Sequence, residues 1–191
     1  MKNHLIVAAK FTLITTLLFG LIYPLAVTGL SQLLFPNQAN GSLIVRNGQI
    51  LGSRLIGQPF SSDKYFHSRP SAAGNGYDAT ASSGSNLAPT NQQLVDRVKQ
   101  DIAKLQLENP GAVIPADMVT TSGSGLDPDI SPASAEFQLP RIARARGTSV
   151  DALRPVLARH TLQRQWGIFG EARVNALELN LDLDASFPAK Q

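Results

Sequence analysis

Ser61 and Lys64 are the residues best placed for nucleophilic chemistry, because they stand in the phrase Ser61-Ser62-Asp63-Lys64. This is the S-x-x-K pattern of penicillin-recognising enzymes, which also need a K-T-G strand. The chain contains no K-T-G. We therefore interpret the phrase as an exposed polar turn. A membrane-anchored exported serine hydrolase, using Ser61 with Lys64 or a serine–histidine pair, is the alternative.

His67 and Arg69 could act as a base, a metal ligand or an anion-binding group. The histidines His4, His67 and His160 lie far apart and show no metal-ligand spacing. We expect His67 to be a hydrogen-bonded loop histidine, and no metal or catalytic residue is assigned. Arg69 can bind phosphate or carboxylate through its planar fork. A pair with Asp63, Asp78 or a carbonyl group is the expectation that we favour.

Two phrases rich in serine and glycine resemble loops that cradle phosphate through backbone amides. Neither has the G-K-[ST] ending of a P-loop, so their composition favours tight turns. Asp127 follows the second phrase and is expected to favour the positive end of a helix that begins near Ser131. The two phrases consist of Ser82, Ser83, Gly84, Ser85 and Asn86, and of Ser122, Gly123, Ser124 and Gly125.

The composition excludes several classes of protein. With no cysteine, the chain has no disulfide framework, thiol nucleophile or cysteine-based zinc site. The formal net charge is only +3 and aromatic residues make up 6%, which argues against nucleic-acid binding. The single tryptophan, Trp166, is expected to be a packing anchor.

The N-terminal region predicts one transmembrane helix. Residues 11–30 carry no charged side chain, and about 20 apolar residues cross a bilayer as a helix. Lys2 and Lys10 precede the span, and no Lys or Arg follows it until Arg46. The positive-inside rule therefore predicts that residues 1–10 are cytoplasmic, 11–34 span the membrane and 35–191 are exported. A cleaved signal peptide is the alternative, although the apolar run is longer than a signal core.

Five residues recur at every fourth position of this span. Most of them are small, and small residues at this spacing let two helix backbones approach closely in lipid. We expect this ridge to contact a partner helix and expect Pro24 to bend the span. The ridge consists of Thr12, Thr16, Gly20, Pro24 and Thr28.

The exported part is predicted to be one α+β domain with strands at both ends and about three helices between them. Asn47-Gly48 is a hairpin turn signal, and residues 59–89 are expected to form an ordered loop pinned by aromatic side chains. Helices are expected after Thr90, after Ser131-Pro132 and after Thr148 or Ser149. Leucine alternates with polar residues over 177–184, which favours a half-buried C-terminal strand.

Six longer phrases of the chain are specific enough to compare with known families. They are Phe35–Leu43, Tyr65-Phe66-His67-Ser68-Arg69-Pro70-Ser71-Ala72, Ala81–Leu87, Val119–Asp127, Ile130-Ser131-Pro132 and Gln138–Arg146. Together they resemble the C subunit of the Kdp potassium-transporting ATPase, and the resemblance covers nearly the whole chain. Asp129 departs from it, because many members carry histidine there.

The resemblance implies a bacterial inner-membrane complex with a channel-like A subunit, an ATP-hydrolysing B subunit and a small F subunit. It implies a non-catalytic accessory subunit that acts as a catalytic chaperone and raises the ATP affinity of the B subunit. The serine-glycine phrase Ser82–Asn86 would then be the ATP contact. Charge placement instead exports the domain, whereas ATP is cytoplasmic, so we expect the effect on ATP to be indirect.

Overall fold

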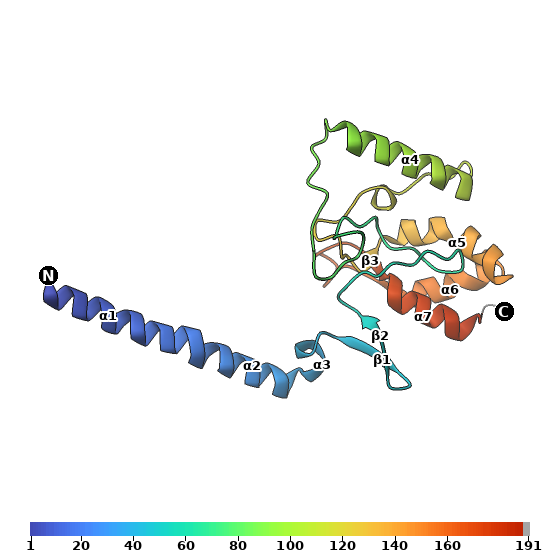
Figure 1. Cartoon of the computed structure of the whole chain (residues 1–191). Helices are drawn as coiled ribbons and strands as arrows, with labels where there is room; N and C mark the ends of the chain where they lie inside the picture. Colours follow the sequence, from blue (N-terminus) through green and yellow to red (C-terminus); the bar gives the residue numbers. More distant parts are fainter. Residues whose placement is uncertain (189–191) are drawn as a thin grey trace. The chain divides into compact units, whose positions relative to one another are not determined.

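The computed structural model describes residues 1–188 and divides the chain into two compact units (Figure 1). The first unit is Met1–Ser53, and the second begins at Arg54. Each unit is described by itself.

The first unit begins with an apolar helical segment, Lys2–Leu34. It consists of α1 (Lys2–Leu17), a π-helical turn (Leu18–Ile22) and α2 (Tyr23–Leu34). Its 33 residues have a hydropathy of 2.2 in their most apolar window, and none of that window is buried. At a rise of 1.5 Å per residue the segment is about 50 Å long, more than the ~30 Å hydrocarbon core. The segment is therefore long and apolar enough to cross a membrane once.

Hydrogen bonding within the segment is irregular where the sequence predicts it. The π-helical turn Leu18–Ile22 comes just before Pro24, which has no N–H to donate to the preceding turn. Thr15 returns its hydroxyl to the carbonyl groups of Phe11 and Thr12, at 2.8 and 3.0 Å. Such local bonds keep a polar side chain satisfied in an apolar environment.

A short helix and a hairpin complete the first unit. Helix α3 (Pro36–Ala39) is followed by the antiparallel strands β1 (Leu43–Arg46) and β2 (Gln49–Ser53), with a bulge at Ile44/Val45. The predicted Asn47-Gly48 turn is confirmed, since both residues have positive φ, 53° and 75°.

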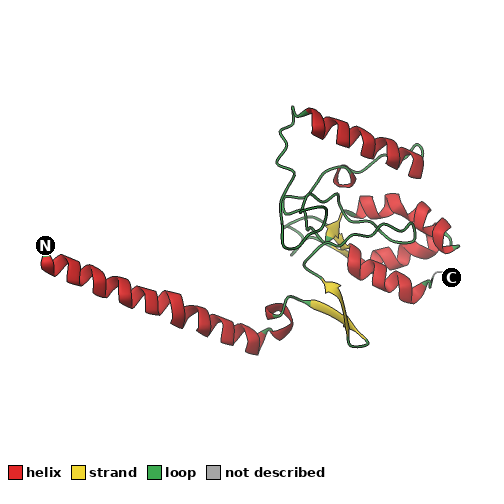
Figure 2. Cartoon of the chain, viewed as in Figure 1, coloured by secondary structure: helices red, strands yellow, loops and turns green. Residues whose placement is uncertain are grey.

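The second unit is α+β, as predicted, and long loops separate its regular elements (Figure 2). Its sheet has the order β3-β5-β4 with antiparallel neighbours. Leu139, Ile142, Val174, Leu179 and Leu183 belong to its core. The elements are α4 (Gln92–Glu108), β3 (Asp129–Ile130), α5 (Pro132–Arg146), α6 (Val150–His160), β4 (Thr161–Leu162), β5 (Arg173–Asn175) and α7 (Ala176–Ser186).

The end signals of α5 and α6 act as the sequence predicts. Ser131 caps α5 by accepting a hydrogen bond from the Ser134 amide, and Gly147 ends it with φ 64°. Ser149 caps α6 by accepting from the Ala152 amide. The prediction for α4 was wrong by one residue, because Asn91 and not Thr90 supplies the cap. An asparagine oxygen caps more strongly than threonine does.

The predicted C-terminal strand is wrong, because residues 176–186 form helix α7. Ala176, Leu179, Asn180 and Leu183 follow the i, i+3, i+4, i+7 spacing of one helical face, and all four are buried. The pattern looked like alternation because Asn180 is polar and was assigned to the exposed face. Asn175 accepts a hydrogen bond from the Glu178 amide, which is a helix cap that the sequence analysis missed.

Candidate functional site

The segment Tyr65–Arg69 has no regular secondary structure, and side chains from two helices bind its backbone. The Phe66 amide donates to Oδ1 of Asn180 at 2.8 Å, and Nδ2 of Asn180 donates to the Phe66 carbonyl at 2.9 Å. Gln138 binds the amide and carbonyl of His67 in the same way, at 2.8 and 3.1 Å. Each carboxamide thus replaces a neighbouring strand and satisfies buried backbone groups. The Phe66 side chain is 1% exposed and belongs to the hydrophobic core.

Arg141 is buried and fixes the start of this segment. Its Nη1 donates to the carbonyl groups of Asp63 and Tyr65, at 2.6 and 2.9 Å. Its Nε pairs with Glu108 of α4 at 2.8 Å, and both side chains are largely buried. The guanidinium fork therefore links α5, α4 and the loop in one hydrogen-bonded unit.

Arg146, the last residue of α5, has a fully buried side chain and also binds backbone carbonyl groups of distant segments. It donates to the carbonyl groups of Lys64 and Phe187, at 2.8 and 2.6 Å, and pairs with Asp184 at 2.8 Å. The Tyr65 hydroxyl donates to the same Asp184 at 3.0 Å. Burial and this acceptor raise the pKa of Tyr65. The phenol therefore stays protonated as a donor.

Arg69 pairs with Asp127, which is not one of the carboxylates that the sequence suggested. The Nη1–Oδ2 distance is 3.0 Å, and Nη2 lies 3.5 Å from the Thr121 carbonyl. The Tyr77 hydroxyl donates to the Arg69 carbonyl. Among residues 1–188, the buried Nε of Arg69 has no hydrogen-bond partner. The charge of Arg69 is thus matched while one of its donors stays unused.

The two serine-glycine phrases lie against each other. The Ser82 hydroxyl donates to the Ser124 carbonyl at 2.9 Å, and the Ser71 hydroxyl donates to the Gly125 carbonyl at 2.6 Å. Gly125 has φ +68°, and a Cβ atom there would lie 2.6 Å from the Ser83 carbonyl oxygen. Glycine is therefore needed for the backbones to come this close. The predicted turn is present in the second phrase, where the Gly125 amide donates to the Ser122 carbonyl at 3.3 Å, whereas residues 82–86 form no turn. The two phrases together form one packed loop pair.

A cleft of about 250 Å³ is lined by residues of the Ser61–Pro70 loop and of α4. His67 and Arg69 from the Tyr65–Arg69 segment line it together with Asp101 and Lys104 of α4. Burial, with the nearby positive charge of Arg141, lowers the pKa of His67, so the ring is neutral at pH 7. Its Nε2 lies 3.1 Å from the Ser62 carbonyl. A carbonyl only accepts, so we assign the proton to Nε2 and the lone pair to Nδ1.

The S-x-x-K phrase lies in a turn and not on a helix. Lys64 places its Nζ 5.5 Å from the centre of the Tyr65 ring. Ser61 and His67 both line the cleft, but within residues 1–188 no hydrogen bond joins them. In the same range, no cluster of three or more His, Asp or Glu side chains could hold a metal ion.

Comparison with known proteins shows to which family the chain belongs. The model of the KdpC family, described as K+-transporting ATPase, c chain, matches residues 5–185. The chain belongs to this family.

Relatives in three bacteria are similar over nearly their full length, and each is named a potassium-transporting ATPase KdpC subunit. The protein of Koribacter versatilis is 61% identical, over 98% of this chain and 97% of the relative. That of Acidobacterium capsulatum is 58% identical, over 95% and 98%. That of Caulobacter vibrioides is 56% identical, over 98% and 96%.

In this KdpC family member the ridge of the apolar helix belongs to the first unit. Thr12, Thr16, Gly20, Pro24 and Thr28 are all exposed. A side chain at Gly20 would meet only Thr16 of its own helix, at 3.8 Å. The ridge is therefore free to receive another helix, and its contact with a partner stays a prediction.

The sequence analysis missed the side chains that hold the Tyr65–Arg69 segment. Gln138, Arg141 and Arg146 lie in a phrase that carries the family resemblance, but the sequence analysis predicted no role for them. Their positions on the same helix as the buried Leu139 and Ile142 are the signal that could have found them, because charged residues are rarely buried unless paired.

Proposed function

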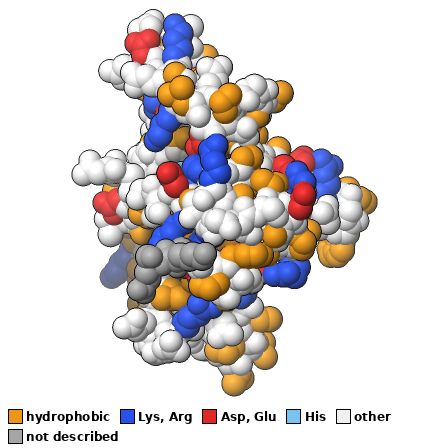
Figure 3. Space-filling view, turned by 90° about the vertical axis from the view of Figure 1, so that its right-hand side faces the viewer, with side chains coloured by type: hydrophobic (Ala, Val, Ile, Leu, Met, Phe, Trp, Pro, Cys, Tyr) orange, Lys and Arg blue, Asp and Glu red, His pale blue; other side chains and the backbone are white. Residues whose placement is uncertain are grey.

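We propose that this KdpC family chain is a non-catalytic accessory subunit of an ATP-driven potassium uptake complex in the bacterial inner membrane. Its partners are a channel-like A subunit, an ATP-hydrolysing B subunit and a small F subunit, together with membrane lipid. Family membership and the names of the relatives support the potassium-pump assignment. Acidic and basic side chains are interspersed on the face drawn in Figure 3, as expected for a protein that does not bind nucleic acid.

The packed loop pair carries the proposal for how the subunit acts. Ser82 and Ser124 are joined by a hydrogen bond, and Gly125 lies directly against Ser83. Phosphate would have to separate these backbones to be cradled between them. The two phrases instead form a packed surface of the second unit, which suits docking to another subunit. The domain thereby stabilises the complex. It also raises the ATP affinity of the B subunit without contacting ATP, through a coupling free energy of about 1–3 kcal/mol.

Removal of the chain from the complex tests the coupling. We expect the ATP affinity of the B subunit to fall about 5–150-fold, in line with that coupling energy. The full-length chain alone in detergent is expected to show no saturable ATP binding by calorimetry. Saturable binding that the double variant Ser82→Ala/Ser83→Ala abolishes, and Gly123→Ala leaves intact, would support direct contact with ATP and overturn the indirect mechanism.

The proposed orientation is tested by labelling, since the chain has no cysteine. Lys99 and Asn3 are both exposed, one in the second unit and one before the apolar span. In intact cells a membrane-impermeant maleimide should label Lys99→Cys but reach Asn3→Cys only after permeabilisation. The opposite pattern would place the domain in the cytoplasm, beside ATP.

A serine hydrolase is the second candidate, because Ser61 and the neutral His67 line the same cleft. Its test is labelling of the full-length chain by a fluorophosphonate, with Ser61→Ala as the control. We expect no labelling that depends on Ser61. Labelling that Ser61→Ala abolishes, without loss of partner subunits, would favour the hydrolase.

A further inference from the structure

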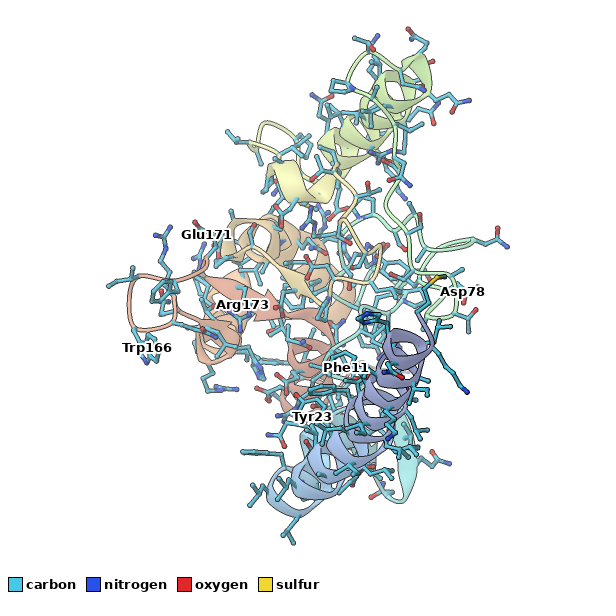
Figure 4. The ribbon with its side chains drawn as sticks, turned by 90° about the vertical axis from the view of Figure 1, so that its left-hand side faces the viewer. Phe11, Tyr23, Asp78, Trp166, Glu171 and Arg173 are labelled. Carbon is cyan, nitrogen blue, oxygen red and sulfur yellow. The ribbon has the colours of Figure 1, made fainter. Side chains whose placement is uncertain are left out.

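The chain's single tryptophan is exposed at the tip of a hairpin, and the expectation that Trp166 is a packing anchor was wrong. Its side chain is 88% exposed, beside Ile168 at 72% and Phe169 at 58%. Trp166 and Phe169 form an edge-to-face pair with ring centres 5.9 Å apart. Figure 4 shows Trp166 at the outer end of the loop, with Arg173 nearer to the sheet. An apolar cluster of this kind on the surface marks an interaction site.

The backbone holds the cluster in place. Gln165 and Phe169 exchange two backbone hydrogen bonds, of 2.9 and 3.0 Å, and close a tight turn. Trp166 has φ 53° and Gly167 has φ 74°. Positive φ is unfavourable for a bulky residue, and strain of this kind gathers where function requires a fixed geometry. The turn thus presents the indole outward at an energetic cost.

Charged side chains flank the tip of the hairpin and are absent from the tip itself. Residues 165–170 carry no charged side chain. Arg164 and Glu171, which flank this stretch, pair with each other at 2.6 Å and so neutralise their charges. An uncharged aromatic tip backed by paired charges fits the boundary between lipid headgroups and acyl chains, where tryptophan is enriched.

We propose that the hairpin tip, residues 165–170, inserts into the surface of the lipid bilayer as a second membrane contact. The apolar span that can cross a membrane belongs to the same chain, and only residues 35–53 separate it from the second unit. At most ~3.6 Å per residue, this connection keeps the domain within about 70 Å of a bilayer, so lipid is always available. The two aromatic rings bury roughly 300–500 Å² at most, less than the ~800 Å² per partner of a specific protein interface.

The unique tryptophan makes the proposal directly measurable. The full-length chain is placed, one copy per nanodisc, in phosphatidylcholine with or without brominated acyl chains. We expect the brominated lipid to quench roughly half or more of the Trp166 emission, because an interfacial indole lies at headgroup level. Aqueous iodide should quench it weakly. Replacing Ile168 and Phe169 by serine should reduce quenching by the lipid while circular dichroism stays unchanged.

A matched control moves the tryptophan elsewhere. Val113 is 90% exposed in another loop, so Trp166→Phe/Val113→Trp carries a single exposed indole away from the hairpin. We expect iodide and not brominated lipid to quench this variant. If iodide and not brominated lipid quenches Trp166 as well, the tip does not enter lipid and the proposal is overturned. A protein partner would then be the ligand of the exposed cluster. Neither result depends on the potassium complex.

Discussion

At the scale of single residues, the second unit depends on buried cations that bind an irregular loop. Arg146 illustrates this, because its fully buried guanidinium meets backbone carbonyls from two separate segments and one carboxylate. A segment without strand partners must find acceptors and donors elsewhere for its buried groups. Long polar side chains from helices supply them here.

Removing this cation should be severely destabilising. Arg146→Met removes the ionic partner of Asp184 and the donor to the carbonyl groups of Lys64 and Phe187, and we expect a loss of about 3–5 kcal/mol in the free energy of unfolding. Arg154 is the matched control, since its side chain is 54% exposed, and Arg154→Met should cost far less than Arg146→Met because an ion pair in water contributes little to stability. Denaturant unfolding of the full-length chain in detergent measures both. Equal losses would show that the buried arginine is dispensable.

Asp182 should make the stability of the second unit depend on acid pH. Hydrogen bonds from His160 and Arg159 lower the pKa of Asp182 from 3.8 to about 2. Because the folded-state pKa is depressed, this stabilisation is complete above the unfolded value and is lost as the pH falls from about 4 toward 2. The stability difference between the wild type and Asp182→Asn should therefore shrink across this range. Unfolding curves at a series of pH values would reveal a constant difference if the prediction fails.

At the scale of elements, two loops pack directly against each other without forming a sheet. The serine-glycine phrases have no regular structure, yet their backbones touch at Gly84 and Gly125. Close approach without side chains is what glycine permits. The loop pair is therefore a packed element in its own right.

Two glycines of one phrase provide a paired test of this packing. A Cβ at Gly125 would lie 2.6 Å from the Ser83 oxygen and 2.7 Å from the Ala73 nitrogen, whereas a Cβ at Gly123 would meet nothing within 4 Å. We expect Gly125→Ala to lower the unfolding free energy by about 1–3 kcal/mol and Gly123→Ala to change it by less than about 0.5 kcal/mol. Thermal unfolding of the two variants compares them. Similar melting temperatures would mean that the loops can separate freely.

At the scale of the whole molecule, the apolar helix is expected to provide the contact within the membrane. Gly20→Leu adds bulk to the ridge without touching other parts of its own helix except Thr16. If the ridge packs against a partner, this change should reduce recovery of the other subunits several-fold, since small residues allow close helix packing. Phe19→Leu, at an exposed neighbouring position, should have no such effect. Co-purification from mild detergent decides, and unchanged recovery with Gly20→Leu would exclude the ridge.

The sequence alone was enough to predict the features that depend only on neighbouring residues. The uncharged run after Lys10 predicts an apolar helix, and the helix is long enough to cross a membrane. Asn47-Gly48 determined the hairpin, and Ser131, Gly147 and Ser149 determined helix ends. Each of these features follows from backbone preferences or hydrogen bonds within a few residues, so no knowledge of the fold was needed.

Only the tertiary structure decided the features that join distant residues. Asn180 is buried because it pairs with the backbone of Phe66, 114 positions away. A buried polar residue on one face of α7 made the helical pattern look like the alternation of apolar and polar residues in a strand. Arg69 pairs with Asp127 across 58 positions, and Ser82 binds Ser124 across 42 positions. Exposure of Trp166 likewise depends on what the rest of the chain leaves uncovered. Sequence spacing encodes local conformation, whereas these contacts depend on how the folded elements pack.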